Sequence, residues 1–189
     1  MIDMSKDWLP LFSSDPFWDG PVKVILGALL VCLLAPIELY VTPDLPVTLQ
    51  SYIVLLLAML MGPWRGVLAV SLYLLMGGVG LPVFASGGAG FAHLAGPTGG
   101  FLVSFVPAAW VAGRIVQVRD RSAGWWRSAL ALLVGHAVIL MGGFVWLCWP
   151  DALGEIPGKL WVLAPGLAIK YAAGLLSFQV IRLLPRLLG

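Results

Sequence analysis

Long apolar stretches follow one another along almost the whole of this sequence, and they limit the folds that it can adopt. Of its 189 residues, 60% are apolar and 11% are charged, whereas a soluble domain is roughly a quarter charged. The few charges are clustered between the apolar stretches, so they cannot cover the surface of a soluble domain. We therefore expect an all-α integral membrane protein surrounded by membrane lipids, because a helix satisfies its backbone hydrogen bonds inside lipid.

Six of these stretches approach the length of about 20 mostly apolar residues that a membrane-spanning helix needs. We expect a six-transmembrane-helix bundle over residues 22–189, with helices at about 22–41, 48–62, 65–82, 98–118, 127–148 and 160–184. Residues 1–21 interleave aromatic and acidic side chains and lack the basic start of a signal peptide. This N-terminal segment is predicted to lie along the membrane interface.

The positions of arginine and lysine predict the orientation of the bundle, because cytoplasmic loops carry an excess of both. Basic residues cluster before the first helix, between the second and third, between the fourth and fifth, and at the end of the sixth. Both termini are therefore expected in the cytoplasm. The outward connections are then residues 42–47, 83–97 and 149–159, in which Lys159 is the sole basic exception. We expect a multi-pass protein of the plasma (inner) membrane of a bacterium.

Several classes of function are disfavoured by what the sequence lacks. It has no Gly-rich phosphate-binding loop, so the chain is not expected to hydrolyse ATP by itself. Its net charge of +2 comes mainly from arginines near helix ends, and no nucleic-acid partner is predicted. His93 and His136 lie on different segments without a carboxylate pair, so we predict no catalytic residues, metal or cofactor. His136 is interpreted as a packing residue.

A glycine-rich segment at residues 77–100 follows the third predicted helix, with nine glycines and two prolines. Irregular backbone at membrane depth is tolerated where it is buried in protein or lines a cavity. We expect a loop folded over a pocket, with a flexible surface loop as the alternative. Pro97 and Thr98 would open the fourth helix, whose free N–H groups could receive an anion or a carbonyl. A helix cap without a ligand role would look the same.

Polar residues at two other places are candidates for contacting a ligand. Thr48 and Gln50 lie at the outer mouth of the second helix, where an amide suits a neutral polar group; an N-cap with a solvated glutamine is the alternative. Lys170 lies about 10 residues into the sixth helix, so about 15 Å below its outer end. A lysine at the bilayer centre costs roughly 2.5–3.5 kcal/mol on insertion scales. We expect it to face the bundle interior and bind a ligand, or else to pair with Glu38 or backbone carbonyls.

Small residues at Ala28, Cys32 and Ala35 form a smooth stripe on the first predicted helix. Such stripes permit close contact between helices in a membrane. The stripe either packs inside the bundle or provides a docking surface for another membrane subunit.

Four strings occur together in this chain: PVTLQ at 46–50, YLLMGGVGLPVF at 73–84, GPTGG at 96–100 and PGLAIK at 165–170. With them, nearly all of the chain from the first helix onward closely resembles the BioY family, the biotin-specific substrate-binding (S) subunits of energy-coupling factor transporters. The resemblance implies a biotin pocket near the outer face, closed by the first and third outward loops. It also implies high-affinity capture of biotin for import.

The resemblance implies a set of candidate contacts with biotin, which are Val47, Thr48, Gln50, Phe84, Ser86, Gly96, Pro97 and Thr98. Lys170 matches the family's lysine in the sixth helix. The family often has an acidic residue three positions earlier, where this chain has Leu167. An ion pair between these two positions is therefore unavailable, which favours a direct role of Lys170 towards the ligand.

The implied partners are a membrane-embedded coupling subunit and two ATP-binding subunits, docking on the stripe of small residues and the cytoplasmic loops. Some family members lack dedicated partners, so transport by this chain alone, as a homo-oligomer, stays open. In our hypothesis Phe84 covers the rings of biotin, Thr48 and Gln50 bind one polar end, and Lys170 binds the other. The alternatives are a binding subunit for another small vitamin and a ligandless membrane assembly subunit.

Overall fold

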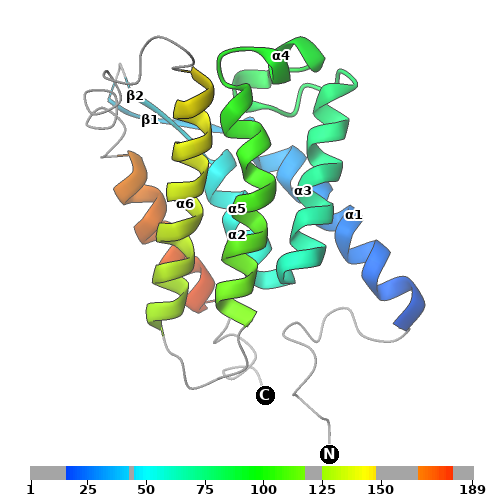
Figure 1. Ribbon diagram of the computed structural model, residues 1–189, viewed down its shortest axis with the longest axis vertical. Coiled ribbons are helices and arrows are strands. Elements are labelled where there is room, and N and C mark those ends of the chain that lie inside the picture. The colour runs from blue at the N-terminus through cyan, green and yellow to red at the C-terminus, as the bar shows by residue number, and fades with distance from the viewer. Residues whose placement is uncertain (1–15, 43–44, 118–124, 148–165, 181–189) are drawn as a thin grey trace, which may run out of the picture.

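The computed structural model of the chain describes residues 16–42, 45–117, 125–147 and 166–180, with the backbone alone described at 16–19, 39–42 and 45–47. The helices are α1 (Pro16–Leu34), α2 (Gln50–Met61), α3 (Pro63–Gly78), α4 (Phe91–Ala95), α5 (Gly99–Gln117) and α6 (Trp125–Leu147), with a last helical segment at Gly166–Val180. An antiparallel hairpin of β1 (Glu38–Thr42) and β2 (Leu45–Thr48) joins α1 to α2. A short 3₁₀ helix, η2 (Ala85–Gly87), lies between α3 and α4. Figure 1 shows the long helices side by side, with the hairpin and α4 at the same end of the bundle.

Helix α5 lies at the centre of the bundle, where it packs against α2, α3 and α6 (Figure 1). Glycines allow its backbone to come close to its neighbours. A Cβ atom on Gly113 would lie 2.6 Å from the backbone nitrogen of Pro63, at the start of α3. A Cβ atom on Gly100 would lie 2.8 Å from the carbonyl oxygen of Gly142 in α6. Small residues at helix contacts are typical of membrane bundles, which gain stability from close packing.

The outer surface of the bundle is strongly apolar. Leu33, Leu75, Leu133 and Leu176 lie on four different helices and are 71%, 65%, 59% and 67% exposed. Helices α5 and α6 are long and apolar enough to cross a membrane, and three shorter apolar helices accompany them in the described residues. A continuous apolar exterior of this kind is expected of a surface that faces lipid.

Most of the predicted helices are found close to their predicted positions. The segments at 48–62, 65–82, 98–118 and 127–148 correspond to α2, α3, α5 and α6, and the described part of 160–184 is helical. The helical bundle is therefore confirmed. The count of six membrane crossings and the cytoplasmic position of both termini stay predictions.

The first predicted helix, 22–41, was wrong at both ends. Helix α1 begins at Pro16 and includes the last residues of the predicted interfacial segment, of which 1–15 lie outside the described residues. A proline fits the first position of a helix, where its missing N–H is not needed. At the other end, Pro36 follows directly after the helix and disfavours its continuation. The chain then pairs as a β-hairpin, which the all-α prediction did not include.

The small-residue stripe of α1 packs inside the protein. Ala28 and Ala35 are fully buried, and the Cys32 Sγ atom lies 3.9 Å from the Met76 Sδ atom of α3. The stripe thus serves the contact between α1 and α3. Of the two alternatives, the described structure favours packing inside the bundle, since Ala28 and Ala35 are covered and Cys32 is partly buried.

Candidate functional site

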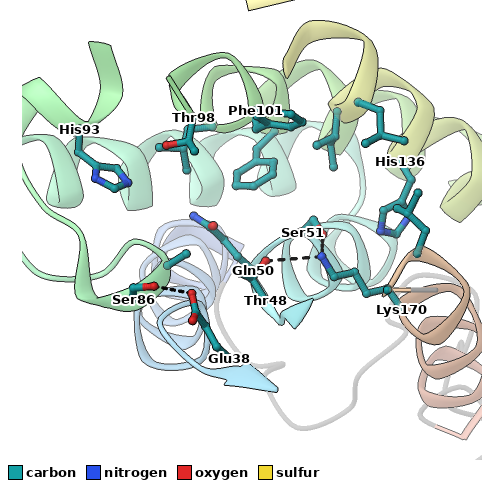
Figure 2. A pocket seen from close by; sticks show the side chains of 17 residues that line it. Glu38, Thr48, Gln50, Ser51, Ser86, His93, Thr98, Phe101, His136 and Lys170 are labelled. Atoms are coloured by element: carbon teal, nitrogen blue, oxygen red, sulfur yellow. Dashed lines mark hydrogen bonds between the residues drawn. The ribbon is translucent and has the colours of Figure 1, made fainter. Parts of the chain in front are cut away.

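A pocket of about 460 Å³ opens at the end of the bundle that carries the hairpin and α4. Cavities of roughly 300–1,000 Å³ are typical of small-molecule sites. Figure 2 shows the lining side chains converging from the hairpin, the loop around η2, and the helices. The lining residues are Glu38, Thr48, Gln50, Ser51, Ala85, Ser86, His93, Thr98, Phe101, Leu102, Phe105, His136, Ile139, Leu140, Gly166, Leu167 and Lys170.

Helical spacing builds the apolar wall of the pocket. Residues three and four positions apart share one face of a helix. The wall follows this rule on two neighbouring helices, with Phe101, Leu102 and Phe105 on α5 and His136, Ile139 and Leu140 on α6. A flat, mostly apolar molecule would find aromatic and aliphatic contacts along this wall.

Lys170 enters the pocket from the last helical segment and is held by hydroxyl groups from the end of β2 and the start of α2. Its Nζ atom donates to the Ser51 Oγ atom at 3.0 Å and to the Thr48 Oγ1 atom at 3.5 Å. Figure 2 shows both bonds converging on the ammonium group. An ammonium group has three protons, so after these two bonds within the described part of the chain one proton can serve a ligand.

Gln50 begins a chain of two buried hydrogen bonds. Its Nε2 atom donates to the hydroxyl oxygen of Tyr73, and that hydroxyl donates to the Val83 carbonyl at 3.2 Å. Phe84 lies next to these groups, with its ring 5.6 Å from the Tyr73 ring and stacked 5.3 Å from the His93 ring, measured between centroids. The start of α2, helix α3 and the glycine-rich loop are thereby joined behind the pocket wall.

The hairpin and the glycine-rich loop also meet at the mouth of the pocket. The Ser86 Oγ atom donates to the Glu38 Oε1 atom at 2.6 Å. Ser86 has a φ of 54°, a left-handed conformation that non-glycine residues seldom adopt. Figure 2 places this pair at one end of the pocket and Lys170 at the other.

Five of the residues that the sequence singled out lie together in the pocket lining: Thr48, Gln50, Ser86, Thr98 and Lys170. The agreement supports the predicted loop folded over a pocket. Thr98 sits in the turn just before α5 begins at Gly99, close to the predicted helix start.

Three other predicted contacts, Phe84, Gly96 and Pro97, are not found among the described lining residues. Phe84 is fully buried behind the wall, where it packs on Tyr73 rather than facing the cavity. Gly96 accepts a hydrogen bond at its carbonyl from the Trp146 Nε1 atom at 3.1 Å, and Pro97 is exposed. The side chain of Val47 lies outside the described residues.

Several lining residues were missed by the sequence interpretation. Ser51 lies three residues after Thr48, and Phe101 lies three residues after Thr98, so helical spacing from the predicted contacts within the predicted helices could have found both. His93 and Glu38 reach the pocket only through the folding of the glycine-rich segment and of the hairpin, and the sequence analysis did not predict the hairpin. His136 was interpreted as a packing residue, but it faces the pocket from α6.

Comparisons with known proteins converge on one family. A sequence model of the BioY family matches residues 14–186. The chain is 38% identical over 128 residues to a protein of Pyrococcus horikoshii described as a probable biotin transporter BioY, covering 66% of this chain and 74% of that protein. It is 37% identical over 131 residues to the biotin transporter BioY of Rhodobacter capsulatus, covering 64% and 68%.

A solved structure has the same fold. It is described as the S-component for biotin from an ECF-type ABC transporter, and it superposes with a TM-score of 0.74 at 22% sequence identity. The match covers 92% of this chain and 95% of that one. The overall fold of this chain thus has an experimental representative.

Proposed function

Because this chain belongs to the BioY family, we propose that it captures biotin as the substrate-binding subunit of an energy-coupling factor type importer. Family membership and the apolar exterior make it a membrane protein. The observation that carries the proposal for this chain is the pocket itself, in which Lys170 is preset by two hydroxyl groups opposite an apolar wall.

The chemistry of biotin matches this pocket. Biotin has an apolar bicyclic body, a neutral ureido group and a carboxylate tail. The Phe101 and Phe105 wall suits the body, while Thr48, Gln50, Ser51 and Lys170 offer polar contacts. An apolar cavity with a few converging polar groups is the usual design of a small-molecule site. Thr48, Gln50, Ser86, Thr98 and Lys170 are the contacts that both sequence and pocket support.

The energy for import would come from other proteins. The chain has no phosphate-binding loop, so we propose that it works with a membrane-embedded coupling subunit and ATP-binding subunits. The proposed setting is the plasma membrane, crossed several times, with both termini in the cytoplasm. Membership in a transporter family favours binding and transport over catalysis. Transport by the chain alone, as an oligomer, is the competing arrangement.

The first experiment is equilibrium binding of labelled biotin to the detergent-purified chain, with desthiobiotin, thiamine and riboflavin as competitors. We expect saturable one-to-one binding at nanomolar to low micromolar biotin, with competition by desthiobiotin alone. Stronger competition by thiamine or riboflavin would assign the pocket to another vitamin. A well-folded, monodisperse sample without binding would contradict the proposal and favour an assembly role.

A further inference from the structure

His136 is a buried polar residue in the pocket lining, and it makes no contact with Lys170, Gln50 or Ser86 through the hydrogen bonds given above. It lies on α6 and is 7% exposed, yet it belongs to the pocket lining. Its Nδ1 atom is 2.9 Å from the carbonyl oxygen of Leu132, one turn earlier in the helix. A carbonyl oxygen can only accept, so this contact requires a proton on Nδ1.

The protonation of Nδ1 determines whether the other ring nitrogen, Nε2, donates or accepts a hydrogen bond. An imidazole in its neutral form carries one proton, so with Nδ1 protonated the Nε2 atom is a hydrogen-bond acceptor. This Nε2 atom is buried and has no hydrogen-bond partner among the described residues. Buried polar atoms are nearly always paired, and an exception in a binding pocket indicates a place for a ligand donor.

The surroundings of Nε2 narrow the kind of ligand group that fits. Figure 2 shows His136 and Lys170 at the same end of the pocket, far from Ser86 and Glu38. The neighbouring lining residues Ile139, Leu140 and Leu167 are apolar. Besides the Ser51 and Thr48 hydroxyls that hold Lys170, this end therefore presents an acceptor, the imidazole, and a donor, the ammonium group. The complementary ligand group has an N–H and a carbonyl side by side.

On the basis of the proposed function, we propose that the Nε2 atom of His136 accepts a hydrogen bond from a ureido N–H of biotin, so that the ring system lies at the His136 and Lys170 end. Ureido N–H groups are the hydrogen-bond donors of biotin at neutral pH, since its carboxylate can only accept. The ureido carbonyl, adjacent to both N–H groups, can accept from Lys170. The carboxylate tail then points away from this end of the pocket.

The test combines two substitutions at His136 with three altered ligands in a binding cycle. The variants are His136→Leu, which removes the acceptor, and His136→Gln, whose side-chain oxygen can replace it. The ligands are biotin, its methyl ester, and the two carbamate analogues in which one or the other ureido N–H is replaced by oxygen. Replacing the N–H that faces Nε2 should weaken binding to the unaltered protein at least tenfold.

The cycle separates a direct contact from a structural role. His136→Leu should lower biotin affinity at least tenfold but change the affinity for that carbamate less than twofold, and His136→Gln should recover most of the loss. His93→Leu is the matched control at the other end of the pocket, and it should affect biotin and both carbamates alike.

Three results would overturn the inference. In the first, the unaltered protein binds both carbamates as tightly as biotin. This measurement does not depend on whether any variant folds. His136→Leu could weaken all ligands equally, which would make His136 a packing residue. The loss in His136→Leu could instead disappear with the methyl ester, which would place the carboxylate at Nε2. Failure of the unaltered protein to bind biotin at all would instead refute the proposed function.

Discussion

At the scale of single residues, Lys170 has the contacts that most directly support the proposed binding role. The hydroxyls of Ser51 and Thr48 hold its ammonium group in place from a segment more than a hundred positions earlier in the sequence. A lysine held in this way keeps a fixed position in a membrane-embedded pocket, where an unpaired one would be expensive. Preset groups of this kind improve affinity, because less freedom is lost on binding.

Replacing Lys170 with methionine keeps nearly the same shape and removes the charge. We expect biotin binding to weaken more than tenfold, because a charge-assisted hydrogen bond to the ligand is lost. Isothermal titration calorimetry on the purified variant measures this change. Lys23→Met on α1, away from the pocket lining, is the matched control and should bind as the unaltered protein does. An unchanged affinity in Lys170→Met would remove this residue from the site.

At the scale of helices, the position of the pocket depends on how closely α5 approaches α3 and α6. Gly113 lets the α5 backbone touch the start of α3, and Gly100 does the same towards α6. The Phe101 and Phe105 side chains are carried by this helix. A change in the crossing of α5 would therefore move the apolar wall as well as loosen the bundle.

The substitution Gly113→Ala tests this dependence. Its Cβ atom would lie 2.6 Å and 2.8 Å from backbone atoms of Pro63 and Gly62, which cannot move aside as a side chain can. Overpacking of this kind costs about 1–3 kcal/mol, so we expect a lower apparent melting temperature in detergent. Gly20→Ala is the control, since nothing lies within 4 Å of its added Cβ. Equal melting temperatures for the two variants would show that α3 and α5 are not in close contact.

Helices and strands also differ in how well the sequence predicts them. Apolar length predicted the helices well, because each span must satisfy its own backbone hydrogen bonds in lipid. The same signal could not detect the hairpin, since residues 38–42 continue the apolar run of α1. Phe84 was a candidate contact implied by the family resemblance, but its ring packs against Tyr73. His136 was missed because spacing alone cannot tell which face of α6 meets the cavity.

At the scale of the whole molecule, the apolar exterior and the distribution of basic residues together predict how the bundle is oriented in the membrane. Exposed leucines cover the bundle on several sides. The pocket, the hairpin and α4 share one end of the bundle (Figure 1). The basic residues predict that the opposite end faces the cytoplasm. The pocket is then presented to the outside, where a nutrient arrives.

Reporter fusions test this orientation. We expect a green fluorescent protein fused after residue 189 to fluoresce and alkaline phosphatase at the same place to be inactive, because both termini are predicted in the cytoplasm. A fusion within 118–124 should behave in the same way, and one within 83–97 should show the opposite pattern. Active phosphatase at the C-terminus would contradict the predicted even number of crossings or their direction.

The hydrogen bond between Ser86 and Glu38 bears on how long a ligand stays in the pocket. The two covers of the pocket, the hairpin and the loop around η2, meet through this bond where water can reach it. An exposed hydrogen bond contributes on the order of 1 kcal/mol, roughly a fivefold shift in an opening equilibrium. A hydrogen bond of this strength neither prevents the release of a bound ligand nor selects which ligand enters. We therefore expect the contacts between the ligand and the pocket to set the residence time, so that a poorly fitting molecule dissociates before it is transported.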